Sequence, residues 1–432
     1  MLLRRAREGL ATIPGGWDVV ARLRLAQVEA KAAPAASVAD AERAFQTAEG
    51  MSAGASGADD SVGTLAASMP MYAENGAVQF LAGSGHEPVA LALARRSSLA
   101  GGDRARLYDS VLVLAKDAAW LKANALQVAS ECQHATGIFP YQGGAGAIRR
   151  AGLDAPDKAE LARMGIATAG SSRTAAQLQF AAIFLESVHR AMPRLDGEIG
   201  GAIASMLTTL GGIGTGADRP LASQTGRQLM GMLQQIDPDA ANRERIAHPE
   251  FGLGLPPLPG SQGPMSPVPR PTADAAGLFQ QAAGTTGDLA YRLYAQSADA
   301  ASGNAELASA ASDAAEEIAE KDKEVVARTP EATLQLCRAL KREGKTRAWR
   351  SLLGQLLAAE ASAMNASERA YSAGSLAEKA KILQLYRSNR FPGSEFGRAA
   401  AVDFGAAADA ALLLPDGMWS SMTLLAVAAN AR

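Results

Sequence analysis

The segment from Ala339 to Thr346 carries the residue types of a phosphate-binding loop. In such a loop backbone N–H groups surround the phosphates, a lysine such as Lys345 reaches the β- and γ-oxygens, and a threonine such as Thr346 holds Mg²⁺. The loop also needs a buried strand before it and a glycine-rich body. Residues 331–339 instead predict a helix, and residues 340–343 are Leu-Lys-Arg-Glu. We therefore expect a helix that ends at Gly344 and no cofactor, although Gly344, Lys345 and Thr346 match the end of the motif weakly.

Five small residues, Gly143 to Ala147, follow Tyr141 and Gln142. They predict a flexible, sterically bare turn that can approach another protein closely. The string Gly144-Ala145-Gly146-Ala147 resembles the Gly-Ala-Gly-Ala catalytic loop of type III secreted Rho-GTPase exchange factors, a class of helical effectors. The resemblance implies that these four residues act on the switch regions of a GTPase. If the turn only connects two helices, Ala145→Leu is expected to leave folding intact.

Two further strings, residues 148–153 and 218–220, are similar to parts of the type III secretion gatekeepers, which are stacked helical bundles. This resemblance implies a helical fold and a bacterial secretion setting. The strings are short, and we assign the chain to no family from them.

Metal binding and nucleophilic catalysis find little support in the sequence. The four histidines, at positions 86, 134, 189 and 248, include no pair four residues apart, the spacing that places two ligands on one helical face. Cys132 and His134 are two residues apart and diverge by about 200° on a helix. Ser84 and His86 lie in a glycine turn rather than a nucleophile elbow. We expect Cys132 to be a core residue and predict no metal site.

Helical periodicity dominates the chain from about residue 87. After Asp103, apolar residues recur at steps of four and three and predict one helix of about 30 residues that stops before Gly137 and Pro140. Its apolar positions are Leu107, Val111, Leu114, Ala118, Leu121, Ala125, Val128 and Cys132. Residues 349–357 form another apolar helical face. Aromatic residues make up 5% of the chain and β-branched runs are scarce, so the predicted fold is all-α, built of multi-helix bundle domains. We find no exact internal repeat, which argues against a solenoid.

Composition divides the chain into four parts. Residues 1–62 predict a flexible N-terminal arm, because residues 52–63 are small and cannot build a core. Residues 63–247 predict a helical bundle domain. Eight prolines between positions 249 and 271 predict a proline-rich linker over residues 248–272. Residues 273–432 predict a C-terminal helical domain.

The charge balance bears on partners and localisation. The net charge of −2 gives no basic field for nucleic acid, so no nucleic-acid partner is expected. Charged residues interrupt the first 24 positions, so the protein is expected to be cytoplasmic or exported without a Sec signal peptide. The stretch 199–217 carries no charge and is near the length needed to span a membrane. A buried helix that ends in a glycine turn is expected there, with a membrane-inserting hairpin as the alternative.

These observations predict a non-catalytic helical adaptor that binds protein partners in a bacterial secretion or host-interaction setting. The alternative is a secreted effector that acts on a host protein, for example a Rho-GTPase exchange factor, or another all-helical enzyme. The sequence favours a role without catalysis and leaves enzymatic activity open. It identifies neither the partner nor the oligomeric state.

Overall fold

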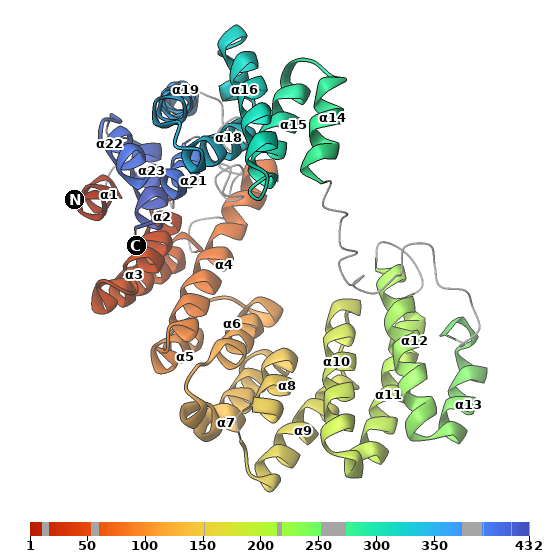
Figure 1. The fold of residues 1–432 in the computed structure, drawn as a ribbon. Helices are drawn as coiled ribbons and strands as arrows, with labels where there is room; N and C mark the ends of the chain where they lie inside the picture. Colours follow the sequence, from red (N-terminus) through yellow and green to blue (C-terminus); the bar gives the residue numbers. More distant parts are fainter. Residues whose placement is uncertain are drawn as a thin grey trace. The chain divides into compact units, whose positions relative to one another are not determined.

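The structure is a computed structural model of the chain. It describes residues 1–10, 17–52, 60–150, 152–213, 218–251, 274–373, 391, 393–415 and 417–431. These residues form helices and no strand, which confirms the predicted all-α fold (Figure 1). Most of the predicted proline-rich linker lies outside the described residues.

The chain divides into two compact units. The unit that we call the central unit contains residues Val38–Gly54 and Ala67–Met265. The unit that we call the terminal unit contains residues Met1–Ser37, Ala55–Ala66 and Ser266–Arg432. The four-part division expected from composition stays a prediction.

The central unit consists of two layers of helices (Figure 1). In one layer α6 (Gly101–Leu114), α8 (Tyr141–Arg150), α10 (Ala175–Ala191) and α12 (Arg219–Ile236) pack side by side in that order. In the other layer α7 (Ala118–Thr136), α9 (Ala155–Ala169), α11 (Asp196–Gly212) and α13 (Pro238–Ala247) do the same. The unit also contains α5 (Glu87–Arg96), the 3₁₀ turns η2 (Pro193–Leu195) and η3 (Pro249–Phe251), and the greater part of α3 (Pro34–Ser52) and α4 (Asp60–Gly83).

This stacking of helix pairs is the arrangement of an α-solenoid. The absence of an exact sequence repeat argued against it. Helix pairs stack when apolar side chains of suitable total volume face one another, and this does not require the same residue at each repeated position. The geometry therefore repeats although the sequence does not.

The predicted helix of about 30 residues is two helices, and that prediction is wrong. The backbone leaves the helix after Leu114 and re-enters it at Ala118. Two neighbouring carboxylates satisfy the N–H groups that the break exposes. Buried Glu87 of α5 accepts the N–H groups of Lys116 (2.7 Å) and Asp117 (3.0 Å). Asp117 in turn caps α7 by accepting from residues 119 and 120.

The uncharged stretch 199–217 begins inside α11, whose residues Ile199, Ile203, Met206 and Leu210 are buried. Residues 214–217 lie outside the described part of the chain. Of the helices that the structure describes, none combines the length and the hydropathy needed to cross a membrane.

The terminal unit also pairs its helices. The helices α15 (Gly287–Ala300), α18 (Pro330–Arg342), α21 (Ser394–Val402) and α23 (Met418–Ala428) pack side by side. Each of the first three is followed by a partner helix packed against it: α16 (Ala305–Lys321), α19 (Thr346–Ala373) and α22 (Phe404–Leu412). The unit further contains α14 (Ala275–Ala283), α17 (Val325–Arg328), α1 (Leu2–Gly9) and α2 (Trp17–Glu29).

The first helices pack into the terminal unit, whereas composition led us to expect a loosely ordered arm there. Both α1 and α2 contact α23. The Arg5 guanidinium donates to the backbone carbonyls of Leu412 and Leu414, the latter at 2.8 Å. Val19 and Leu25 of α2 are buried. Short amphipathic helices of this kind gain their stability from the surface that covers them, which local composition does not reveal.

A candidate binding groove between α19 and α22

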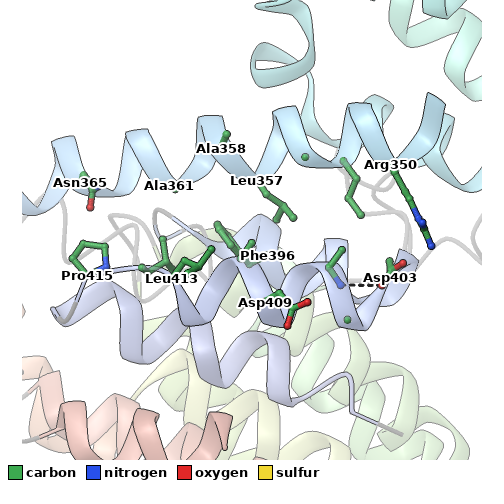
Figure 2. A pocket seen from close by; sticks show the side chains of 16 residues that line it. Arg350, Leu357, Ala358, Ala361, Asn365, Phe396, Asp403, Asp409, Leu413 and Pro415 are labelled. Atoms are coloured by element: carbon green, nitrogen blue, oxygen red, sulfur yellow. Dashed lines mark hydrogen bonds between the residues drawn. The ribbon is translucent and has the colours of Figure 1, made fainter. Parts of the chain in front are cut away.

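A groove of about 680 Å³ runs between α19 and α22 in the terminal unit (Figure 2). Its floor is apolar. Leu353 and Leu357 of α19 and Phe396 of α21 supply it, and all three side chains are buried. Arg350 and Asp403 mark one end of the groove, and Asn365 and Pro415 mark the other.

The groove exists because α22 presents small residues, mainly alanines, toward α19. Asp403 begins this helix by accepting the N–H of Ala406 (3.0 Å), and the alanines that follow have the highest helix propensity. Leu414 and Pro415 follow its end, and proline cannot continue a helix. Alanine side chains are too short to reach across to α19, so a channel remains above Phe396.

The two rims are small as well. On α19 the lining residues follow one another at steps of four, three and four, which places them along one face: Gly354, Ala358, Ala361 and Asn365. On α22 the rim contains Gly405, Ala406 and Ala410. Beyond the end of α22, Leu413 also lines the groove, and 86% of it is exposed to solvent. The walls are therefore low: between Asn365 on α19 and Asp409 on α22, their tops present mainly backbone and methyl groups.

Three charged side chains lie along the groove. Asp403 and Asp409 come from the α22 side and Arg350 from α19 (Figure 2). The Arg350 guanidinium lies 5.3 Å from the centre of the Trp349 ring. Among the residues that the structure describes, Asp409 has no hydrogen-bond or ion-pair partner. Two carboxylates face one guanidinium, so the groove carries an excess of negative charge.

The phosphate-loop-like segment lies elsewhere in this unit and is occupied by its own neighbours. Its first four residues form the end of helix α18 (Pro330–Arg342), and Gly344 has a positive φ of 77° just beyond that helix, as the sequence predicted. The Lys345 ammonium is 2.6 Å from a carboxylate oxygen of Asp313 and 3.0 Å from one of Glu343. Thr346 begins α19. The lysine that would bind phosphate is held by carboxylates.

The predicted turn at Gly144, Ala145, Gly146 and Ala147 is not a turn. All four residues are buried inside α8, and Ala145 is 3% exposed. Their small size lets α8 approach its neighbours closely: a Cβ atom on Gly144 would lie 2.7 Å from the Phe139 ring. The sequence showed the glycines and alanines but not the helices that surround them, so close helix packing was mistaken for a bare turn.

The remaining candidate residues are also structural. Cys132 is buried, its thiol donates to the carbonyl of Ile138 (3.2 Å), and burial raises the pKa of this thiol to about 12. Burial likewise raises the pKa of the Cys337 thiol to about 12. Nδ1 of His189 lies 2.8 Å from a carboxylate oxygen of Asp196. Within the described parts of the chain, no three histidine, cysteine or acidic residues are placed to hold a metal ion.

The sequence did not reveal the groove, although it revealed one wall. The apolar face at residues 349–357 was visible as a helical pattern, but nothing local shows that a helix of alanines lies opposite. No protein-family model matches this chain, and neither the curated proteins nor the solved structures include a significant match. The chemistry of the groove must be argued from its own geometry.

Proposed function

We propose that this protein is a non-catalytic protein-binding protein whose terminal unit binds a helical segment of a partner. The observation that carries the proposal is the open groove between α19 and α22, with its apolar floor and low rims. Proteins that receive an amphipathic helix in a groove offer this combination, because the partner's apolar face is buried between two helices. Helices pack at interaxial distances of about 8–10 Å when the side chains between them are small, as they are on these rims.

The apolar floor of the groove and the three charged side chains along it support binding. Its ionisable lining residues are two aspartates and one arginine, without a cysteine or a histidine. Both cysteines of the chain are buried, and their raised pKa values keep the thiols protonated near neutral pH.

The alternative function is a secreted effector that acts on a host protein or another all-helical enzyme, and its exchange-factor example rested on the Gly144–Ala147 string. The burial of this string in α8 leaves that example without a surface loop on which to act. The bacterial secretion or host-interaction setting is part of the proposal and rests on the short sequence resemblances alone.

Filling the groove tests the proposed function. Ala358→Trp places a large neutral side chain between the rims, and Ala363→Trp places the same side chain on an exposed position of α19 outside the groove. Partners are captured with the wild-type protein, identified, purified and returned to the three proteins in a binding titration. We expect the purified partner to bind the wild type and Ala363→Trp alike, and Ala358→Trp at least about tenfold more weakly.

Circular dichroism of each variant verifies that the helices are retained. A purified partner that binds all three proteins equally would show that the groove is not the binding surface.

A further inference from the structure

The charges beside the groove indicate which kind of helix it accepts. We infer that the α19/α22 groove selects an amphipathic helix that carries a lysine or arginine beside its apolar face, positioned to meet Asp409. This inference rests on the proposed function, because it names the partner chemistry of the same groove.

The length of the groove suits a helix of about four turns. The α19 wall runs from Arg350 to Asn365, about 22 Å at the rise of an α-helix. Over that length, apolar residues at positions i, i+3 or i+4, and i+7 of a partner helix point to one side. They would lie over Leu353, Leu357 and Phe396, the buried floor of the groove.

Charge complementarity indicates which charge the partner helix carries beside its apolar face. Asp409 is exposed on the α22 rim and has no partner among the described residues. Asp403 lies on the same side, while the single guanidinium, Arg350, lies on the opposite wall against the Trp349 ring (Figure 2). A lysine or arginine on the edge of the partner helix that lies along α22 is attracted by both carboxylates, whereas a glutamate or aspartate there is repelled.

Leu413 also favours an apolar occupant. It lines the groove beside the apolar floor, and 86% of its surface is exposed to solvent. A helix in the groove would cover this side chain together with the floor.

Three synthetic peptides of about 16 residues, long enough for about 22 Å of helix, test the inference. The first is amphipathic, with leucines on one face and lysines along one edge of that face. The second replaces these lysines with glutamates, and the third has the composition of the first in an order without amphipathicity. Fluorescence anisotropy measures the affinity of each for the full chain at two salt concentrations.

We expect the lysine peptide to bind at least about tenfold more tightly than the glutamate peptide, a difference of about 1.4 kcal/mol. Asp409→Lys should remove or reverse this preference, and the preference should weaken as salt is added. Glu320→Lys, the same charge change on an exposed position of α16 outside the groove, should leave the preference unchanged. Ala358→Trp should weaken both amphipathic peptides, while Ala363→Trp should not.

Each contrary result overturns a distinct claim. If both amphipathic peptides bind equally and Asp409→Lys has no effect, the charge selection is refuted while groove binding stands. If the non-amphipathic lysine peptide binds as well as the first, the attraction is a general charge effect and the inference fails. Sedimentation that shows a dimer dissolved by Ala358→Trp would identify a second copy of the chain as the occupant and would also overturn it. If no peptide binds while the captured partner still requires an open groove, the inference fails and the proposed function remains.

Discussion

Asp109 provides a test of the central unit that depends on one partly buried charge. This carboxyl group lies on α6 and accepts the N–H of Gly143, at the start of α8, at 2.8 Å. Burial raises the pKa of Asp109 from 3.8 to about 6, although the N–H groups of residues 142 and 143 act in the opposite direction. The folded protein therefore holds a proton on this group at pH values where the unfolded chain has released it.

The sign of the pH effect follows from this difference. Because the folded state binds more protons between about pH 4 and pH 6, its stability falls as the pH rises through that window and becomes constant above it. A shift of about two pKa units corresponds to about 3 kcal/mol over the whole window. About 2 kcal/mol of this falls between about pH 4.5 and about pH 7.5.

Asp109→Asn should remove this dependence. The amide has the shape of the protonated carboxyl group, its oxygen can still accept the Gly143 N–H, and it is neutral at every pH. Relative to the wild type, the variant should therefore gain about 2 kcal/mol more stability at about pH 7.5 than at about pH 4.5. Native-state hydrogen exchange of peptides from α6 and α8 measures this gain against the wild type at each pH.

Asp117→Asn is the matched control. Asp117 is an exposed N-cap of α7, and asparagine caps a helix about as well, so this variant should change little and by the same amount at both pH values. An Asp109→Asn variant whose stability relative to the wild type is the same at both pH values would refute the argument that the partly buried charge of Asp109 weakens the folded state.

Three further predictions follow from the packing. Gly165→Ala should lower the stability of the central unit by about 1–3 kcal/mol, because its Cβ would lie 2.3 Å from the Phe184 ring. Gly197→Ala is the control: its Cβ meets nothing within 4 Å, so it should be neutral or stabilising by up to about 1 kcal/mol. Thermal unfolding compares the Gly165 and Gly197 variants, and equal melting temperatures would contradict the argument. Ala145→Leu should destabilise the central unit by about 1–3 kcal/mol in the same assay, because Ala145 is buried in α8. This is the opposite of the tolerance expected from the sequence, and a wild-type melting temperature would support that expectation. Limited proteolysis should cut within the predicted linker at residues 248–272. The two fragments should still co-elute in size-exclusion chromatography under native conditions, because α1 packs against α23. Fragments that separate without denaturant would show that this contact is weak.

Local sequence patterns determined the helical character of this protein. Steps of three and four between apolar residues predicted helical faces, and a glycine after a basic stretch predicted the end of α18 at Gly344. Such signals need only neighbouring residues, because a helix satisfies its own backbone within four positions. The all-α fold and the end of a helix near Gly344 could therefore be predicted from the sequence.

Tertiary structure decided where those helices stop and what their faces contact. The break after Leu114 depends on Glu87, which comes from another helix and satisfies the exposed N–H groups. Residues 143–147 are bare as a sequence, but Leu112, Phe139 and Phe184 surround them in space. Whether a run of small residues is a free turn or a close helix contact depends on residues distant in the chain.

The groove shows the same limit for function. The leucines at 353 and 357 belong to the apolar face that the sequence predicts at residues 349–357. Only the fold places α19 and α22 on either side of Phe396 and leaves the space between them open. Sequence alone determined the helical character of the chain because the hydrogen bonds of a helix are local. The groove is a space between short side chains, and it exists only after the helices have packed.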